Sequence, residues 1–266
     1  MNLLKIINML DLTKVDHEEY VKPAMRRDLF KKAKDFSLKA ALTSAPFALA
    51  AMPGIVKAQA SSVNDVLNFA LTLEYLEDEF YTMALKSPDL KIPESDKNIF
   101  MQIQKHESAH VAFLKGALGM NAVSKPTFDF TAGGAFPTAF TEYQTFLALA
   151  QAFEDTGVRA YKGQAGNLMS SDGTLTAALN IHSVEARHAS VVRRLRGLNG
   201  WITGNDRGTG MPAATQAVYN GEENTTQAGV ALASITKVTG NGLSEAFDEP
   251  LTKDQVLAIA TLFIKK

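Results

Sequence analysis

The sequence predicts an all-α protein whose central part is a four-helix bundle of two antiparallel hairpins joined by a long crossover. Four segments with helical periodicity, at about 63–86, 94–118, 138–168 and 174–198, contain no proline. A break with two prolines separates the first two segments, the turn "MSSDG" separates the last two, and a long non-helical stretch lies between the pairs. Two short turns with one long connection are typical of crossover bundles.

Residues at the segment ends support the same division. Ser62 or Asn64 is suited to cap the first helix, and Gly119 is suited to end the second. Ser171 or Asp172 is the expected cap of the fourth helix. We therefore place the bundle domain at residues 61–199.

Residues 200–266 form a C-terminal extension that we expect to pack on the bundle as irregular coil with short helices. Its first part is rich in Gly, Asn and Thr, which favour turns over regular elements. Helical pieces are predicted at 231–238 and at 253–264, the second capped by Thr252 after Pro250. No residue pattern in this extension indicates chemistry.

Composition excludes several classes of protein. The 266 residues carry a formal net charge of −1, whereas a nucleic-acid binder needs a basic surface. Because the chain has no cysteine, it has no disulfide, thiolate metal site or cysteine-bound iron–sulfur cluster. We expect no transmembrane segment, since Lys39 and two prolines interrupt the apolar stretch near the N-terminus.

Residues 1–60 have the order of an export leader. Arg26 and Arg27 precede an Ala- and Leu-rich stretch, and Ala58-Gln59-Ala60 forms a cleavage site of the A-x-A type. The segment around the arginine pair resembles a twin-arginine signal. We predict interaction with export machinery and a periplasmic or extracellular location; the alternative is an amphipathic helix that stays attached.

A repeated motif connects the two hairpins. In each hairpin, a glutamate is followed seven residues later by a tyrosine, and the next segment carries the pattern E-x2-H. The two glutamates of a hairpin lie at similar distances from its turn, so antiparallel packing brings them to one height. The repeat consists of Glu74, Tyr81, Glu107 and His110 in the first hairpin, and Glu154, Tyr161, Glu185 and His188 in the second.

This layer predicts a site for two divalent metal ions. Residues three apart on a helix share a face, so each E-x2-H pair can reach one centre. Four carboxylates among apolar neighbours cost several kcal/mol each unless cations compensate them. Mixed oxygen and nitrogen ligands favour iron or manganese. The predicted ligands are Glu74, Glu107, His110, Glu154, Glu185 and His188, with Tyr81 and Tyr161 as donors that orient ligating carboxylates.

The pattern as a whole resembles the ferritin-like superfamily from about Val63 to Leu198. The stretches "VLNFALTLEYLEDEFY", "HESAHVAFL" and "HSVEARHAS" are similar to exported bacterial ferritin-like domain proteins related to desiccation-associated proteins of plants. The resemblance implies a ferritin-like four-helix bundle with a di-iron or dimanganese centre. All six ligand positions and both tyrosines match, which makes the combined pattern specific.

The same stretch also contains the H-E-x-x-H motif of zinc proteases, with His106 and His110 as the two histidines. The second hairpin carries Val184 at the position equivalent to His106, whereas Glu185 and His188 are kept. We therefore reject the protease and interpret His106 as a bystander, whose replacement by alanine leaves the metal content unchanged.

Several charged residues compete with this interpretation. Glu77 is one turn after Glu74, but Gly157 occupies its equivalent in the second hairpin, so Glu77 is predicted to be solvated or next to the site. His182 is an alternative ligand or proton carrier. Arg159 and Arg187 are interpreted as surface charges, with pairing to surplus carboxylates as the alternative.

Two functions follow from these expectations. The first is an exported oxidoreductase-type dimetal protein that acts on dioxygen or peroxide. A peroxidase would need an external electron donor, because the chain lacks cysteines for a rubredoxin module. The second is a non-enzymatic stress, desiccation or envelope protein whose metal site is structural or vestigial. The chain is also a candidate homo-oligomer.

Overall fold

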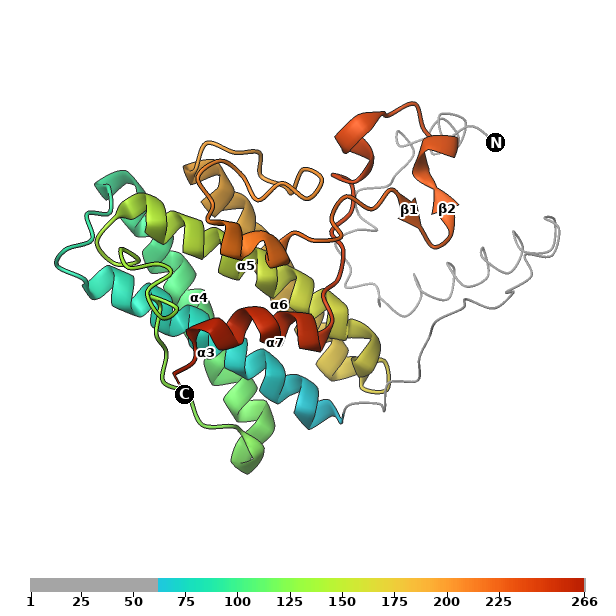
Figure 1. Ribbon diagram of the computed structural model, residues 1–266. Helices are drawn as coiled ribbons and strands as arrows, with labels where there is room; N and C mark the ends of the chain where they lie inside the picture. The colour runs from blue at the N-terminus through green and yellow to red at the C-terminus, as the bar shows by residue number, and fades with distance from the viewer. Residues whose placement is uncertain (1–61, 266) are drawn as a thin grey trace, which may run out of the picture. The chain divides into compact units, whose positions relative to one another are not determined.

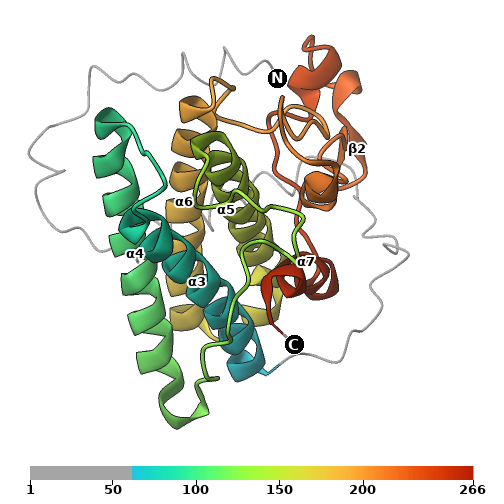
Figure 2. The same ribbon diagram turned by 60° about the vertical axis from the view of Figure 1, so that its left-hand side comes forward.

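Four long helices lie side by side as two antiparallel pairs (Figures 1 and 2). The structure is a computed structural model that describes residues 62–265. Helices α3 (Val63–Lys86) and α4 (Glu94–Leu118) form the first pair, and α5 (Tyr143–Ala165) and α6 (Asp172–Leu195) form the second. Helix α3 contacts α5, and α4 contacts α6. The predicted all-α class and the bundle with its long crossover are confirmed.

The ends of the first hairpin are those that the sequence predicts. The Ser62 hydroxyl accepts a hydrogen bond from Asp65 N at 3.1 Å, and the Asp65 carboxylate accepts one from Ser62 N at 3.1 Å. This reciprocal capping box begins α3. Gly119, with a φ of 55°, ends α4 in a conformation that glycine adopts without steric cost.

The ends of the second hairpin differ from the prediction. Helix α5 starts at Tyr143 instead of residue 138, because residues 138–142 form tight turns in which the Thr138 hydroxyl donates to Glu142 at 3.1 Å. Such local bonds compete with helix formation. Helix α6 starts at Asp172, two residues earlier than predicted, and ends at Leu195.

An aromatic cluster fills one end of the bundle. The ring centroid of Phe80 lies 5.2 Å from that of Phe146 and 5.0 Å from that of Phe153, and Phe100 stands 4.8 Å from Phe146. These rings come from α3, α4 and α5 and pack both stacked and edge-on, which are favourable aromatic arrangements. The cluster therefore joins the two hairpins at the end near the turn between α3 and α4.

The C-terminal extension returns to the bundle through α7 (Lys253–Ala260), which is followed by the 3₁₀ helix η7 (Thr261–Phe263). Helix α7 packs against α5, and Figure 1 shows it in red across the bundle. After η7, Ile264 pairs with Phe128 of the crossover in an antiparallel bridge. The end of the chain thus holds the crossover in place. The helix expected at 253–264 is present as α7 and η7.

The helix predicted at 231–238 is present only as a single 3₁₀ turn, η5 (Leu232–Ser234). Just before it, strands β1 (Thr226–Gln227) and β2 (Val230–Ala231) form a short antiparallel hairpin that was not predicted. Ala228 and Gly229 between them have φ values of 49° and 81°, which suit a two-residue hairpin loop. The remaining short elements are 3₁₀ helices, namely η2 (Gly119–Asn121), η3 (Gly166–Leu168), η4 (Ala213–Val218) and η6 (Gly240–Leu243).

Arg159 of α5 anchors the C-terminal extension, which corrects its interpretation as a surface charge. Its side chain is only 1% exposed. Its guanidinium donates to the backbone oxygens of Val218, Asn220 and Glu249 and forms an ion pair with Glu222 at 2.8 Å. A planar guanidinium with five N–H donors suits such a buried junction.

The predicted leader, residues 1–60, lies outside the described residues. Among the helices that the structure describes, none is both long and apolar enough to cross a membrane.

Candidate metal centre

Six side chains from the four bundle helices meet inside the bundle. The four glutamates have no exposed surface, and both histidines are buried. They form two overlapping groups of four residues whose candidate ligand atoms lie within 4.8 Å of one another. The structure therefore brings together all the residues that the repeat predicts as ligands, which are Glu74, Glu107, His110, Glu154, Glu185 and His188.

Glu107 and Glu185 belong to both groups. Glu107 places one carboxylate oxygen 3.0 Å from His110 Nδ1 and the other 2.8 Å from His188 Nδ1. Glu185 does the same, with distances of 3.2 Å to His110 Nδ1 and 3.8 Å to His188 Nδ1. Each of these two carboxylates thus stands between the two histidines and directs one oxygen to each of them.

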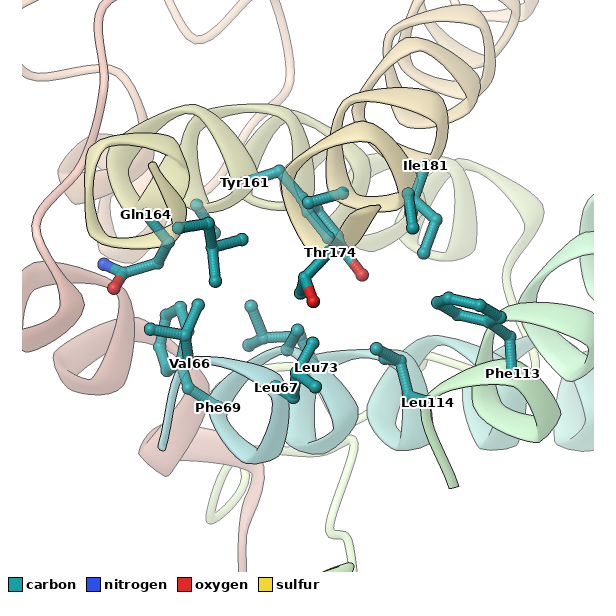
Figure 3. A pocket seen from close by; sticks show the side chains of 15 residues that line it. Val66, Leu67, Phe69, Leu73, Phe113, Leu114, Tyr161, Gln164, Thr174 and Ile181 are labelled. Atoms are coloured by element: carbon teal, nitrogen blue, oxygen red, sulfur yellow. The ribbon is translucent and has the colours of Figure 1, made fainter. Parts of the chain in front are cut away.

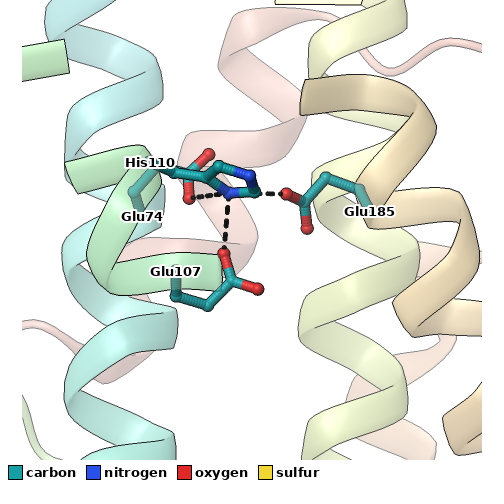
Figure 4. A group of neighbouring side chains, drawn as sticks. All are labelled: Glu74, Glu107, His110 and Glu185. Carbon is teal, nitrogen blue, oxygen red and sulfur yellow. Dashed lines mark hydrogen bonds and ion pairs between the residues drawn. The ribbon is translucent and has the colours of Figure 1, made fainter. Parts of the chain in front are cut away.

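Glu74 and Glu154 each belong to one group only. A Glu74 oxygen lies 3.1 Å from His110 Nδ1, and a Glu154 oxygen lies 3.3 Å from His188 Nδ1. Figure 4 shows Glu74, Glu107 and Glu185 converging on His110 from three helices. The site therefore has two similar halves. Each half has one histidine and one glutamate that the other half does not share, which we call the terminal glutamate of that half.

The two tyrosines connect the hairpins. Tyr81 of α3 donates its hydroxyl hydrogen to Glu154 of α5, and Tyr161 of α5 donates to Glu74 of α3. Each donor thus holds the terminal glutamate of the opposite hairpin. Because each phenol occupies one carboxylate oxygen, it leaves the other oxygen directed at the site.

Burial sets the protonation of the carboxylates. It raises the pKa of Glu74 and of Glu107, and the neighbouring Glu185 adds to both increases. Burial also raises the pKa of Glu154, to about 7, although His188 opposes the increase. Four adjacent buried acids cannot all be charged without positive charge beside them.

The histidines supply positive charge when no metal does. Burial alone would lower the pKa of His110, but hydrogen bonds with Glu107, Glu185 and Glu74 outweigh burial and raise it to about 12. The pKa of His188 is raised in the same way, because Glu154 and Glu107 outweigh burial. A metal ion bound at either histidine would take the place of this proton.

Unsatisfied polar atoms test whether the residues fit a metal. Five of them, within residues 62–265, are buried in the site and face a charged neighbour without a hydrogen bond of suitable geometry; they are Glu107 Oε1, Glu154 Oε2, both oxygens of Glu185 and Nδ1 of His188. Buried polar atoms without partners are rare and costly. Here they are lone-pair donors that converge on one region, which is the arrangement a cation needs.

The match with a known family comes from the helical part of the chain. A model of the ferritin-like domain matches residues 62–198, just over half of the sequence. The chain belongs to the ferritin-like family. No curated protein matches it. The ferritin-like match covers all four bundle helices and every residue of the buried cluster, whereas the C-terminal extension lies outside it.

His106 is not a bystander of the ferritin-like centre. Its ring stacks on that of His188, with an interplanar angle of 9°, and its Nδ1 lies 2.9 Å from His188 Nε2. Its other nitrogen lies 2.7 Å from the Gln102 amide. With Nδ1 of His188 directed at the carboxylates, His106 is the partner that fixes the ring orientation and tautomer of His188. The contact crosses between hairpins, so no pattern within one helix could reveal it.

We expect His106→Ala to weaken metal binding at the His188 half of the site by roughly 10- to 100-fold, because loss of such an outer partner frees the ligating ring. At saturating metal, the metal content of the variant should equal that of the parent protein. Titration of the metal-free protein with Mn²⁺ measures the change. His106→Gln, which keeps an acceptor, should recover part of the affinity; equal affinity in His106→Ala and the parent protein would contradict the expectation.

Two other residues, His182 and Glu77, were alternative candidates for the site, and the structure places them differently. His182 lies outside both candidate ligand groups, and burial lowers its pKa. Glu77 also lies outside both groups, but it is only 3% exposed, so of the two predicted positions it takes the one next to the site. Gly157, its equivalent in the second hairpin, is its neighbour in the structure.

Two hollows approach the centre. A narrow apolar cavity of about 20 Å³ lies between the hairpins, with Leu73, Leu114 and Ile181 in its wall and Tyr161 beside it (Figure 3). Each of the three aliphatic residues is within one helical turn of a residue of the site. An open groove of about 420 Å³ between α4 and α6 has His106 and His188 in its wall.

Proposed function

We propose that this ferritin-like chain binds two iron or manganese ions through the six-residue site and acts as an oxidoreductase on dioxygen or peroxide. The observation that carries the proposal is the position of Glu107 and Glu185, each of which directs one oxygen to each half of the site. Carboxylates placed in this way between two nitrogen ligands are suited to hold two cations close together.

The charge and chemistry of the donor set support this choice of metal. Four buried carboxylates match the charge of two divalent ions. Hard oxygen donors combined with two imidazoles favour iron or manganese, whereas calcium prefers oxygen alone and structural zinc prefers thiolates and histidines. The chain has no cysteine to alter that preference.

The residues around the site define its properties. Tyr81 and Tyr161 hold the terminal glutamates, while the aromatic and aliphatic side chains of the bundle exclude bulk water. When bound, the two ions supply the electrons exchanged with dioxygen or peroxide. A small apolar molecule such as dioxygen suits the narrow cavity beside Tyr161, and a polar one suits the groove at His106.

The cellular setting is part of the proposal. The twin-arginine-type leader supports export to the periplasm or beyond, since that pathway transports folded and often metal-loaded proteins. Because the chain has no cysteine for an iron–sulfur or rubredoxin module, peroxidase activity needs an external electron donor. A disproportionation of peroxide needs none.

Metal loading followed by turnover tests the proposal. We expect two Fe²⁺ or Mn²⁺ per chain by elemental analysis, and consumption of peroxide or dioxygen by the loaded protein. The Glu107→Ala variant, treated identically, is the control, because any metal that it retains is bound outside the six-residue site. Two bound ions that raise the melting temperature with no turnover of either oxidant would favour the non-enzymatic stress or envelope protein. A chain that binds neither ion would refute the dimetal site.

A further inference from the structure

Glu77 is an acidic side chain beside the centre for which the six-ligand site has no role. It lies on α3 one turn after Glu74 and is only 3% exposed. No hydrogen bond or ion pair of its carboxylate is found within residues 62–265. A buried carboxylate in this position is costly unless a cation or a proton neutralises it.

Gly157 of α5 provides the space that Glu77 occupies. A Cβ atom added at Gly157 would lie 3.3 Å from Glu77 Oε1 and 3.4 Å from Glu185 Oε2. Both carboxylates therefore approach the same point on the α5 backbone, where any side chain would crowd them. In the repeat, Gly157 is the counterpart of Glu77, so one hairpin carries an extra acid and the other carries the gap that admits it.

A cavity of about 10 Å³ lies beside Glu77, under α7, and its wall is mostly apolar, with Leu73, Leu76, Phe153 and Ile259. The one hydroxyl in this wall, that of Thr156, donates to the backbone oxygen of Ala152. That space is too small for more than about one water molecule. The charged neighbours that raise the pKa of Glu77, after burial itself, are the four glutamates of the centre, with Glu185 first. These carboxylates repel an ionised Glu77 unless a cation lies among them.

We propose that Glu77 is a seventh ligand of the centre, which reaches one of the two ions past Gly157 on the side of Glu185. This inference rests on the proposed dimetal function and extends it. Five carboxylates carry one negative charge more than two divalent ions balance, so the complete ligand set matches a pair with one divalent and one trivalent ion. The negative charge of Glu77 thereby favours the mixed-valence pair, with one divalent and one trivalent ion, over the pair with two divalent ions.

Titration of the metal-free full-length chain with Mn²⁺ tests the ligand. Glu77→Gln keeps the shape and removes the charge; it should still bind two ions, one of them at least tenfold more weakly. Gly157→Ala should weaken the same ion, because the added methyl group keeps Glu77 and Glu185 apart. The matched control is Gly116→Ala on the exposed face of α4, where a Cβ meets nothing within 4 Å.

A second measurement uses the iron-loaded protein. The midpoint potential of the pair should be more positive in Glu77→Gln than in the parent chain, since a negative ligand stabilises the oxidised pair. Unchanged melting of the metal-free variants shows that a loss of affinity does not come from unfolding. Two ions bound with parental affinity and potential in Glu77→Gln would overturn the seventh ligand and leave the proposed function intact. A parent chain that binds no ion would overturn both.

Discussion

Removal of either central carboxylate, by Glu107→Ala or Glu185→Ala, is expected to reduce metal binding from two ions per chain to none. Each carboxylate directs one oxygen to each histidine, so one substitution removes a ligand from both halves of the site. By contrast, Glu74→Ala removes a ligand from one half only and should leave one ion bound. Elemental analysis after dialysis measures the three contents.

Folding must be separated from binding in this comparison. Burial raises the pKa of Glu107, which shows that the buried carboxylate is unfavourable in the metal-free protein. The metal-free Glu107→Ala variant should therefore melt at or above the temperature of the metal-free parent protein. Glu94→Ala, an exposed site on the same helix, is the control for the change in charge. Equal metal losses in Glu107→Ala and Glu74→Ala would show that Glu107 serves one ion only.

Gly163→Ala is expected to produce a large loss of stability although it lies outside the centre. A Cβ at this position would lie 1.9 Å from the backbone oxygen of Leu251, which cannot move like a flexible side chain. Leu251 is also fixed by its N–H, which donates to Arg159 O at 3.1 Å. Such overpacking costs about 3 kcal/mol or more and displaces the extension from α5.

Thermal melting and urea unfolding measure this effect. A loss of about 3 kcal/mol corresponds to a decrease in melting temperature on the order of 10 °C for a chain of this size. Gly116→Ala supplies the matched comparison and should be neutral or stabilising, because alanine favours a helix over glycine at an open position. Similar melting of the two variants would mean that the extension does not press on α5.

The bundle and the six clustered residues could be predicted because both depend on spacing along single helices. The period of 3.6 residues places Glu107 and His110 on one face, and the same spacing recurs in Glu185 and His188. Antiparallel pairing then brings equivalent positions to one height. The capping residues Ser62 and Gly119 also act locally, so the ends of the first hairpin could be predicted as well.

Contacts between segments that lie far apart in the sequence could not be predicted. His106 meets His188 across the hairpins, and Arg159 is buried by an extension of irregular coil that has no periodicity to reveal its path. The repeat pairs Glu77 with Gly157 and so gives Glu77 no role as a ligand. In the structure, the absence of a side chain at Gly157 is what admits Glu77, a relation that only three-dimensional packing reveals.

The bridge between Phe128 and Ile264 has a consequence for the order of assembly. During synthesis, the four helices are made well before Ile264, so the crossover lacks this partner until the C-terminal extension has been made. A proteolytic cut or a substitution at Ile264 therefore also affects the crossover between the hairpins, although the two segments lie far apart along the chain.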